Sequence, residues 1–374
     1  MEELSTPDES VVTLDSSNLS EISFSANPQI LVIGCGGAGN NCVNQLHKLD
    51  IKGAQTIAIN TDKQHLEMIE ADKKILIGTQ VTNGMGVGGD PRIAMKCVDV
   101  SRPVLDEILC EAELVFIIAG MGGGTGTGVA PLIAEIAKSH GSIVVGIATT
   151  PFKMERLRMR VAQVGLIHLK KHANSLIMVD NNKLLKIAPK LPMQDAFKVI
   201  DNLIAEIVHG ITETITQPSL INLDFADVKA IMGNGGVATM LFGEGTTANP
   251  ETIIKNALKN PLLDTNCKGA VGALIHITGG DKMSLQIVQD ITAGITHRLD
   301  ANANIIMGAS VKPELGKRVK VLTIMTGLKP PKMLCPMDDE IRDPVRRRIP
   351  RIHGGSSQDT DLEPFDDYKM PPTK

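Results

Sequence analysis

Five of the seven residues from 122 to 128 are glycine, in the sequence GGGTGTG. The segment follows an apolar run of strand length (114–119) and precedes a stretch with helical periodicity (129–139). Because glycine loses more backbone freedom on folding than other residues, this composition would be costly in a turn with no other role. It suits a loop whose bare N–H groups converge on anionic oxygens. No lysine follows the glycines, which excludes a Walker-type loop.

Two further glycine-rich segments strengthen this interpretation. Residues 34–39 (GCGGAG) match GxGxxG at a strand-to-helix turn, and Asp62 lies at the end of the next predicted strand. By itself this pattern fits either a dinucleotide site, with the acid on a ribose hydroxyl, or a tight turn without a ligand. Residues 84–91 (GMGVGGDP) form a third run that could approach the same ligand. Three such loops at the carboxyl ends of strands predict a phosphate-bearing ligand.

The hydrophobic pattern predicts an α/β fold. Strand-like runs at 30–33, 56–60, 114–119 and 142–149 alternate with helical stretches at 40–48, 62–71 and 129–139. This alternation is typical of a parallel sheet with helices on both faces, as in Rossmann-like domains. A long helix is predicted over 193–216. Beyond it, strands at 270–278, 305–309 and 320–326 and helices at 252–259 and 283–299 predict a smaller α/β or α+β domain.

Composition sets the outer boundaries of these domains. Residues 1–27 contain six acidic residues and no lysine or arginine, and residues 330–374 contain 8 of the 20 prolines. Segments of this kind bury too little apolar surface to offset their ordering entropy, so both are predicted to be disordered tails. The folded part is therefore predicted to be a first domain at 28–216, which includes the long helix, and a second domain at 217–329.

Charge and residue usage exclude several classes of protein. The net charge of −4 argues against a nucleic-acid binder. The longest apolar runs fall far short of the ~20 residues that span a bilayer, and no secretory signal is evident. The six cysteines show no paired CxxC spacing, which disfavours a zinc site or a disulfide framework. Reduced thiols in a cytoplasmic protein are the simplest interpretation.

Taken together, the motifs resemble the tubulin/FtsZ superfamily, whose signature the 122–128 loop matches residue for residue. Within it, the chain resembles the FtsZ family of cell-division GTPases rather than tubulin. The sequences of several motifs are closer to those of archaeal members than to those of bacterial ones. The resemblance covers 28–329. The other similar stretches are GCGGAGNN (34–41), NTD (60–62), PF with Glu155 (151–155), NNKLL (181–185), DAF (195–197) and NLDFADV (222–228).

The resemblance implies that the first domain binds GTP or GDP, with Mg²⁺ held by the nucleotide phosphates and not by a metal site of the protein. The first loop would wrap the phosphates, the 122–128 loop would hold the β- and γ-phosphates, and 88–89 would close over the γ-phosphate. The implied GTP-binding residues are Gly36, Gly37, Ala38, Gly39, Asn40, Asn41, Asn60, Asp62, Gly88, Gly89, Gly122, Gly123, Gly124, Thr125, Gly126, Thr127, Gly128, Glu155, Arg158, Asn181, Phe197 and Asp201.

Some of these assignments leave alternatives open. The chain is one residue shorter than bacterial relatives between Pro151 and Gly165, so the arginine beside Glu155 is taken as Arg158, with Arg160 in reserve. Asp201 would accept the N1–H and the exocyclic amine of guanine, and Phe197 would stack on the base. Without the resemblance, Phe197 would be read as a core residue and Asp201 as part of a solvated face.

The resemblance also implies a catalytic loop at Asn222, Asp224 and Asp227. Asp224 and Asp227 are three residues apart, which places them on one face of a helical turn. A neutral explanation is helix capping by Asn222 or Asp224. In FtsZ-like proteins this loop enters the nucleotide pocket of the neighbouring subunit and orients the attacking water. GTP hydrolysis would then require head-to-tail filaments, as in a cytokinetic ring at midcell.

The carboxyl tail is implied to dock membrane tethers and regulatory division proteins, with no direct insertion into a membrane. Residues 361–368 mix acids with apolar anchors, and Arg346, Arg347, Arg348 and Arg351 form a basic cluster. Three alternatives remain at this point: a relative that controls cell shape rather than division, a superfamily member that polymerises with scarcely any turnover, and a nicotinamide-dependent oxidoreductase.

Overall fold

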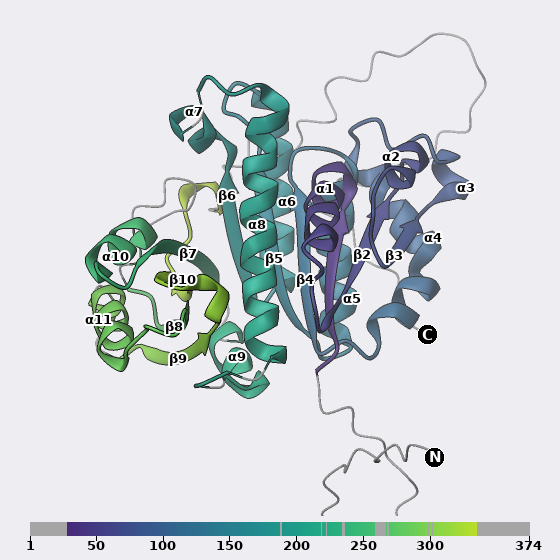
Figure 1. Cartoon of the computed structure of the whole chain (residues 1–374). Helices are drawn as coiled ribbons and strands as arrows, with labels where there is room; N and C mark the ends of the chain where they lie inside the picture. The colour runs from purple at the N-terminus through teal and green to yellow at the C-terminus, as the bar shows by residue number, and fades with distance from the viewer. Residues whose placement is uncertain are drawn as a thin grey trace, which may run out of the picture.

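Ten strands form one continuous sheet in the computed structural model, in the order β3-β2-β1-β4-β5-β6-β7-β10-β8-β9 (Figure 1). The structure describes residues 28–334 except 188, 218, 222, 234–235, 259–266, 268, 298 and 301. Six parallel strands make up the first part of the sheet. They are β1 (Ile30–Cys35), β2 (Ala54–Asn60), β3 (Lys73–Leu76), β4 (Leu114–Gly120), β5 (Ile143–Thr150) and β6 (Ser175–Asp180).

The strand order reverses at β1, which pairs with β2 on one side and with β4 on the other. The last residue of β1, Cys35, is in register with Ile59 of β2 and with Ala119 of β4. Ligands of open parallel sheets bind outside the carboxyl ends of strands at such a switch point. Two of the three glycine-rich loops begin at this point.

Helices cover both faces of the parallel strands. Val32 and Phe116 belong to a buried cluster that includes α1 and α8, and Ile33 and Ile117 belong to a second cluster that includes α4, α5 and α6. The alternation of neighbouring residues between two cores explains why β1 and β4 are apolar along almost their whole length. The helices of this part are α1 (Gly36–Lys48), α2 (Lys63–Glu67), α3 (Thr79–Thr82), α4 (Pro91–Leu109), α5 (Thr125–Ser139), α6 (Arg156–His172), η1 (Asn181–Lys183), α7 (Leu184–Ile187) and α8 (Met193–Thr216).

The second part of the sheet is mainly antiparallel. Its central strand, β10, runs antiparallel to β7 and β8, while β8 and β9 are parallel. Strand pairing among the described residues joins it to the first part at two positions, Leu176 with Val237 and Ile177 with Ala238. Its elements are α9 (Phe225–Met232), β7 (Val237–Thr246), α10 (Pro250–Leu258), β8 (Gly272–Gly279), α11 (Leu285–Thr296), β9 (Asn304–Val311), η2 (Pro313–Leu315), β10 (Arg318–Leu328) and η3 (Lys332–Leu334).

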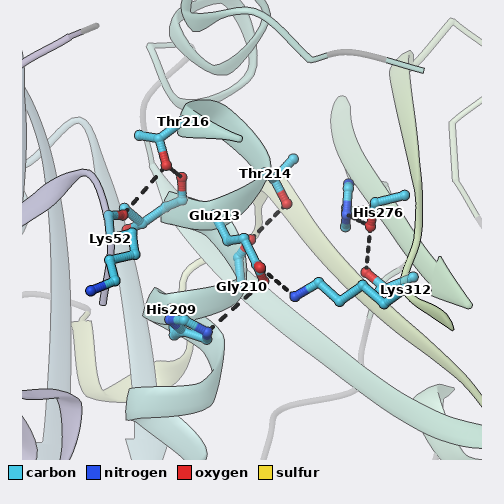
Figure 2. Close-up of polar contacts among 11 residues, drawn as sticks. Lys52, His209, Gly210, Glu213, Thr214, Thr216, His276 and Lys312 are labelled. Carbon is cyan, nitrogen blue, oxygen red and sulfur yellow. Dashed lines mark hydrogen bonds and ion pairs between the residues drawn. The ribbon is translucent and has the colours of Figure 1, made fainter. Parts of the chain in front are cut away.

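Helix α8 lies between the two parts, and its bounds confirm the helix predicted over 193–216 (Figure 1). Polar contacts tie it to both sides (Figure 2). Glu213 forms an ion pair with Lys312, which follows β9, and Thr216 Oγ1 donates to the carbonyl oxygen of Lys52 at 3.4 Å. A cavity of about 320 Å³ is lined by residues of α8, β8 and β10, among them His209 and His276.

The predicted α/β fold is confirmed, and several boundaries differ from the predicted ones. Helix α1 begins at Gly36 rather than at 40, and α5 begins at Thr125 rather than at 129, so glycines of both loops form first helical turns. The helix predicted over 62–71 ends at Glu67. The sequence pattern missed β3, α3, α4, α6, β6, α7 and β7.

The predicted carboxyl tail also begins too early. Residues 332–334 form the short helix η3, and Leu334 is buried in the core beside α6. Because the Leu334 side chain packs in the core, the folded part of the chain extends beyond residue 329. The remainder of that tail, with its arginine cluster, and the amino-terminal tail lie outside the described residues. Among the described helices, none is long and apolar enough to cross a membrane.

Candidate functional site

The first turns of α1 and α5 meet where β1 and β4 end. A Cβ placed on Gly36 would lie 2.8 Å from the backbone nitrogen of Gly126. The N-cap residues of α1 and α5, Cys35 and Gly124, make no side-chain capping hydrogen bond, and those of α3, α6 and α8 make none either, whereas Asp62, Asp90, Asp224 and Ser284 cap α2, α4, α9 and α11. The first N–H groups of a helix have no partner within the helix, and its positive end favours anions. Two adjacent uncapped helix starts therefore form a site for an anion.

Several loop glycines are required by close packing. A Cβ on Gly39 would lie 2.2 Å from the carbonyl oxygen of Ile118, and one on Gly128 would lie 2.3 Å from that of Pro91. A Cβ on Gly126 would meet the carbonyl oxygen of Gly120 at 2.6 Å. These glycines bring α1, α4, α5 and the sheet close together. Their role is to position the loops.

Other loop glycines face open space. No described atom lies within 4 Å of a Cβ placed on Gly88, Gly89 or Gly123, and only the ring of His65 approaches Gly37, at 3.7 Å. At these four positions the neighbouring atoms leave room for a side chain, so packing does not explain why the residue is glycine. Gly88 and Gly89 have positive φ angles of 58° and 85°, a conformation that side chains with a Cβ rarely adopt. The open glycines mark the positions where a ligand can reach the backbone.

The 84–90 loop is held against α5. The Gly86 N–H donates to the carbonyl oxygen of Thr61 at 3.0 Å, and a Cβ on Gly124 would lie 2.4 Å from Val87 Cγ2. Asp90 caps α4 and forms an ion pair with Arg92 at 2.8 Å. These contacts place the open glycines 88 and 89 beside the start of α5.

Two of the implied binding residues turn inward. Asn40 is fully buried; with its amide oriented to satisfy its neighbours, it donates to Gly34 and Ile59 carbonyl oxygens and accepts from Asn60 Nδ2. Asn60 Oδ1 in turn accepts the Thr61 N–H at 2.9 Å. These side chains join α1 to the ends of β1 and β2. By contrast, Gly37, Ala38 and Asn41 form the exposed face of the first turns of α1.

The threonines and glycines of the 122–128 loop have distinct contacts. Thr127 is fully buried, and its Oγ1 accepts the Gly122 N–H at 2.9 Å, so that N–H is already used. Thr125 Oγ1 lies 2.8 Å from Thr61 Oγ1, which links α5 to the end of β2.

Asp62, the next residue after Thr61, caps α2 by accepting the His65 N–H at 3.1 Å.

Glu155 and Arg158 lie together at the start of α6. Arg158 Nη1 donates to Glu155 Oε2 at 2.9 Å, and Glu155 Oε1 accepts the Phe152 N–H at 3.1 Å. The Arg158 side chain is 66% exposed and can reach a ligand. Arg160 is exposed as well. At the end of β6, Asn181 Oδ1 is buried with no hydrogen-bond partner among the described residues. An orphaned buried acceptor is costly unless a ligand or water satisfies it.

Asp201 and Phe197 lie at the amino-terminal end of α8. Asp201 Oδ1 accepts a hydrogen bond of 3.0 Å from Cys42 Sγ on α1. Burial raises the pKa of the Asp201 carboxyl, while the Cys42 hydrogen bond lowers it. The Phe197 ring is 37% exposed, so it is not a core residue, and its centroid lies 6.0 Å from that of Phe152. This corner offers a carboxylate and an aromatic face from one helix.

The acidic pair of the predicted catalytic loop lies elsewhere. Asp227 N–H donates to Asp224 Oδ1 at 2.8 Å, and Asp224 N–H donates to Asp227 Oδ2 at 3.1 Å, which forms a capping box on α9. Asp224 is exposed. Figure 1 shows α9 beside the carboxyl-terminal end of α8, at the opposite end from α7. The structure therefore gathers the predicted nucleotide residues but not the acidic pair. Asn222 lies outside the described residues.

Three residues near the site were not found from the sequence. Cys42, Phe152 and Thr61 contact the implied site residues Asp201, Phe197 and Thr125. Phe152 and Thr61 lie inside motifs that carry the family resemblance, which is the one signal that could have indicated them. Cys42 follows such a motif directly, and no local pattern connects it with a residue on α8.

The comparisons with known proteins agree with this arrangement. Residues 29–189 match the tubulin/FtsZ family GTPase domain, and residues 236–329 match the FtsZ family C-terminal domain. Cell division protein FtsZ 2 of Halobacterium salinarum is 50% identical over 324 residues, which cover 86% of this chain and 82% of that protein.

Solved structures share the fold. An FtsZ dimer from M. jannaschii superposes with a TM-score of 0.76 at 44% identity, covering 81% of this chain and 89% of that one. CetZ2 from Haloferax volcanii has a TM-score of 0.71 at 21% identity, covering 82% and 95%, and so shares the fold alone. The three organisms are archaea, which agrees with the resemblance of the motif sequences to archaeal members.

Proposed function

Because the chain belongs to the FtsZ family of tubulin-like GTPases, we propose that it hydrolyses GTP and polymerises head to tail into filaments of the cell-division ring. One observation carries the nucleotide site: the uncapped first turns of α1 and α5 meet beside glycines that face open space. The buried acceptor of Asn181, which has no partner among the described residues, supports a ligand at the same corner. The residues present fit a guanine nucleotide.

The phosphates bind across the two helix starts. Backbone N–H groups around Gly37 and Gly123 hold the inner phosphates, and Gly88 and Gly89 close over the γ-phosphate. The packed members of the implied set (Gly39, Asn40, Asn60, Gly126, Thr127 and Gly128) keep the loops in position. Mg²⁺, bound through phosphate oxygens, would neutralise charge on the β- and γ-phosphates.

Ribose and base lie toward α6 and α8. Glu155 and Arg158 contact the ribose and phosphate, and Asn181 Oδ1 accepts a hydrogen bond from the nucleoside. The Asp201 carboxylate accepts N1–H and the exocyclic amine of guanine. Phe197, supported by Phe152, stacks on the base.

Hydrolysis requires a second copy of the chain. Asp224 and Asp227 lie at the other end of α8, a helix of 24 residues and thus about 36 Å long. Placed against the nucleotide of the next subunit, the two carboxylates and Asn222 would orient a water for attack on the γ-phosphorus. A bond forms from the water oxygen to phosphorus as the bond to the β–γ bridging oxygen breaks, and GDP leaves with that electron pair. The water proton passes to the acidic loop or to solvent.

This arrangement explains assembly. The two contacting surfaces are different ends of the same molecule, so the interface is heterologous and extends into an open filament. We place the domain boundary after α8, with 28–216 binding the nucleotide and the folded residues from 217 onward supplying the acidic loop. The carboxyl tail recruits membrane tethers and regulators to the cytoplasmic face of the division site.

The alternatives lack an observation of their own. The oxidoreductase interpretation rests on the 34–39 loop and on Asp62, whose carboxylate caps α2. No observation on the described residues favours a shape-controlling relative over a division protein. The polymer with scarcely any turnover is disfavoured because both acidic residues of the loop are present.

The experiment is to measure phosphate release from GTP with Mg²⁺ across a range of protein concentrations. We expect no turnover below a threshold and a linear rise above it, because a complete site forms only between subunits. Light scattering in the same samples should rise at the same threshold. A rate proportional to concentration from zero would show a self-contained site and would contradict the role given to the acidic loop.

A further inference from the structure

A thiol lies directly behind the carboxylate that is placed against guanine. Cys42 lies in the second turn of α1 and is 1% exposed, and its Sγ is 3.0 Å from Asp201 Oδ1. Burial and the nearby Asp201 charge raise the pKa of the Cys42 thiol well above its usual range. Cys42 is therefore a neutral S–H group and can donate to the carboxylate.

The Asp201 carboxylate needs such a donor. It is partly buried between α1 and α8, and burial disfavours its ionised form. Guanine presents two donors on one edge, and only the ionised carboxylate accepts both with its two oxygens. A donor on Oδ1 favours that form and fixes the rotation of the carboxylate plane.

The contact also joins two parts of the nucleotide site. Cys42 belongs to α1, whose first turn faces the phosphates, while Asp201 belongs to α8, whose first turns face the base. The two residues are 159 positions apart in the sequence. The bond therefore links the helix that begins at the phosphate loop to the carboxylate that is proposed to read the base.

We propose that Cys42 is a positioning residue for guanine recognition, which acts by orienting the Asp201 carboxylate through its Sγ–Oδ1 hydrogen bond. This inference rests on the proposed function, in which Asp201 reads the base. Cys42 itself touches no nucleotide.

The test compares the affinities of GDP and IDP, because inosine lacks the exocyclic amine of guanine and neither diphosphate is hydrolysed. Both are titrated against a fluorescent GDP analogue, below the assembly threshold. For Cys42→Ala we expect the preference for GDP over IDP to fall by about tenfold, the size of one charge-assisted hydrogen bond. Cys42→Ser, which keeps a donor, should retain most of the preference.

Cys97→Ala is the matched control, because Cys97 is equally buried in the same part of the fold and its Sγ faces the Gly78 carbonyl oxygen. It should leave the GDP:IDP ratio unchanged. If Cys42→Ala does not fold, Cys42→Val fills the space of the thiol without a donor and serves instead. An unchanged ratio in the donor-free variant would overturn the proposal, as would equal losses in the donor-free and serine variants.

Asp201→Ala distinguishes a failure of the role proposed for Cys42 from a failure of the role proposed for Asp201. If it abolishes the preference for GDP while the donor-free Cys42 variant keeps it, the inference about Cys42 fails and the role of Asp201 stands. If the unmodified protein shows no preference, or Asp201→Ala keeps it, the base-reading part of the proposed function fails, and the inference fails with it.

Discussion

Individual glycines of the three loops serve two different purposes, and the space around each one separates them. Gly39, Gly126 and Gly128 lie against backbone oxygens, so a Cβ would force the helices away from the sheet. Gly37, Gly88, Gly89 and Gly123 lie against open space. The first group maintains the geometry of the site, and the second group leaves room for its ligand.

Gly123→Val should abolish GTP binding without unfolding the protein. Gly123 does not have a positive φ, and no described atom would contact its Cβ, so we expect the free energy of unfolding to change by less than about 1 kcal/mol. The new side chain would occupy the space where phosphates approach the backbone. Urea unfolding and nucleotide titration would measure the two effects.

Gly128→Ala provides the opposite control. Its Cβ would lie 2.3 Å from the Pro91 carbonyl oxygen, so it should lower stability by about 1–3 kcal/mol through overpacking. Normal GTP affinity in Gly123→Val would mean that the phosphates do not approach α5 at this point.

At the scale of elements, α9 has an amino terminus with two potential roles. Asp224 and Asp227 form a reciprocal capping box, which fully accounts for their spacing within a single chain. Asp224 is exposed and Asp227 is partly exposed, and α9 lies at the end of α8 opposite to α7 (Figure 1). Capping and catalysis can be separated by substitution, because capping needs an acceptor oxygen and catalysis needs the charge.

Asp224→Asn should keep the helix and lose the GTPase activity. Asparagine caps as well as aspartate does, so stability should be unchanged, while Asp224→Ala should cost about 1 kcal/mol. Loss of the carboxylate should lower kcat by about 10²–10⁴, the range for a group that handles a proton in the transition state. Equal rates for Asp224→Asn and the unmodified protein would leave Asp224 as a cap only.

Mixing supplies the control for this prediction. The Asp224→Asn chain keeps an intact nucleotide site, and the Gly123→Val chain keeps an intact acidic loop. Equal mixtures should recover up to about one quarter of the normal rate, because one interface in four would combine the two intact halves in a heterologous polymer.

At the scale of the whole molecule, α8 and the second part of the sheet meet at a seam that contains a buried histidine. His276 is 7% exposed on β8, and its Nε2 lies 3.0 Å from Ser310 Oγ. Burial lowers the pKa of His276 to about 4; Glu213 opposes this shift and Lys312 adds to it. The folded protein therefore holds this ring neutral beside the ion pair of Figure 2.

The free energy of unfolding should consequently decrease as the pH is lowered from about 6.5 to about 4. In the unfolded chain His276 titrates near 6.5, so in this window the unfolded state binds a proton that the folded state does not. The contribution of His276 to the free energy of unfolding is fully present above pH 6.5. About 3 kcal/mol of it is lost as the pH is lowered to about 4. Urea unfolding at several pH values should show this slope, and His276→Asn should flatten it. The slope will not vanish, because burial also lowers the pKa of His172 to about 4. An unaltered slope in His276→Asn would show that this ring does not carry the effect.

Local motifs by themselves determined the class of fold and the family, and they predicted a phosphate-bearing ligand and an acidic loop. GGGTGTG and GCGGAG encode bare backbone at strand ends, and the 24-residue helix α8 has a periodicity strong enough to give its bounds. Helices α4 and α6 escaped prediction: Pro103 interrupts the helical pattern of the first, and charged residues run through the second.

Only the tertiary structure decided how these parts are used. It separated packed glycines from open ones, because that distinction depends on neighbours such as Ile118 and Pro91. It paired Cys42 with Asp201 through a contact between helices that no local pattern encodes. It also placed α9, which Asp224 caps, beside the carboxyl-terminal end of α8 and at the opposite end from α7 (Figure 1). Distances between elements come from packing of the whole chain, and a motif carries no information about them.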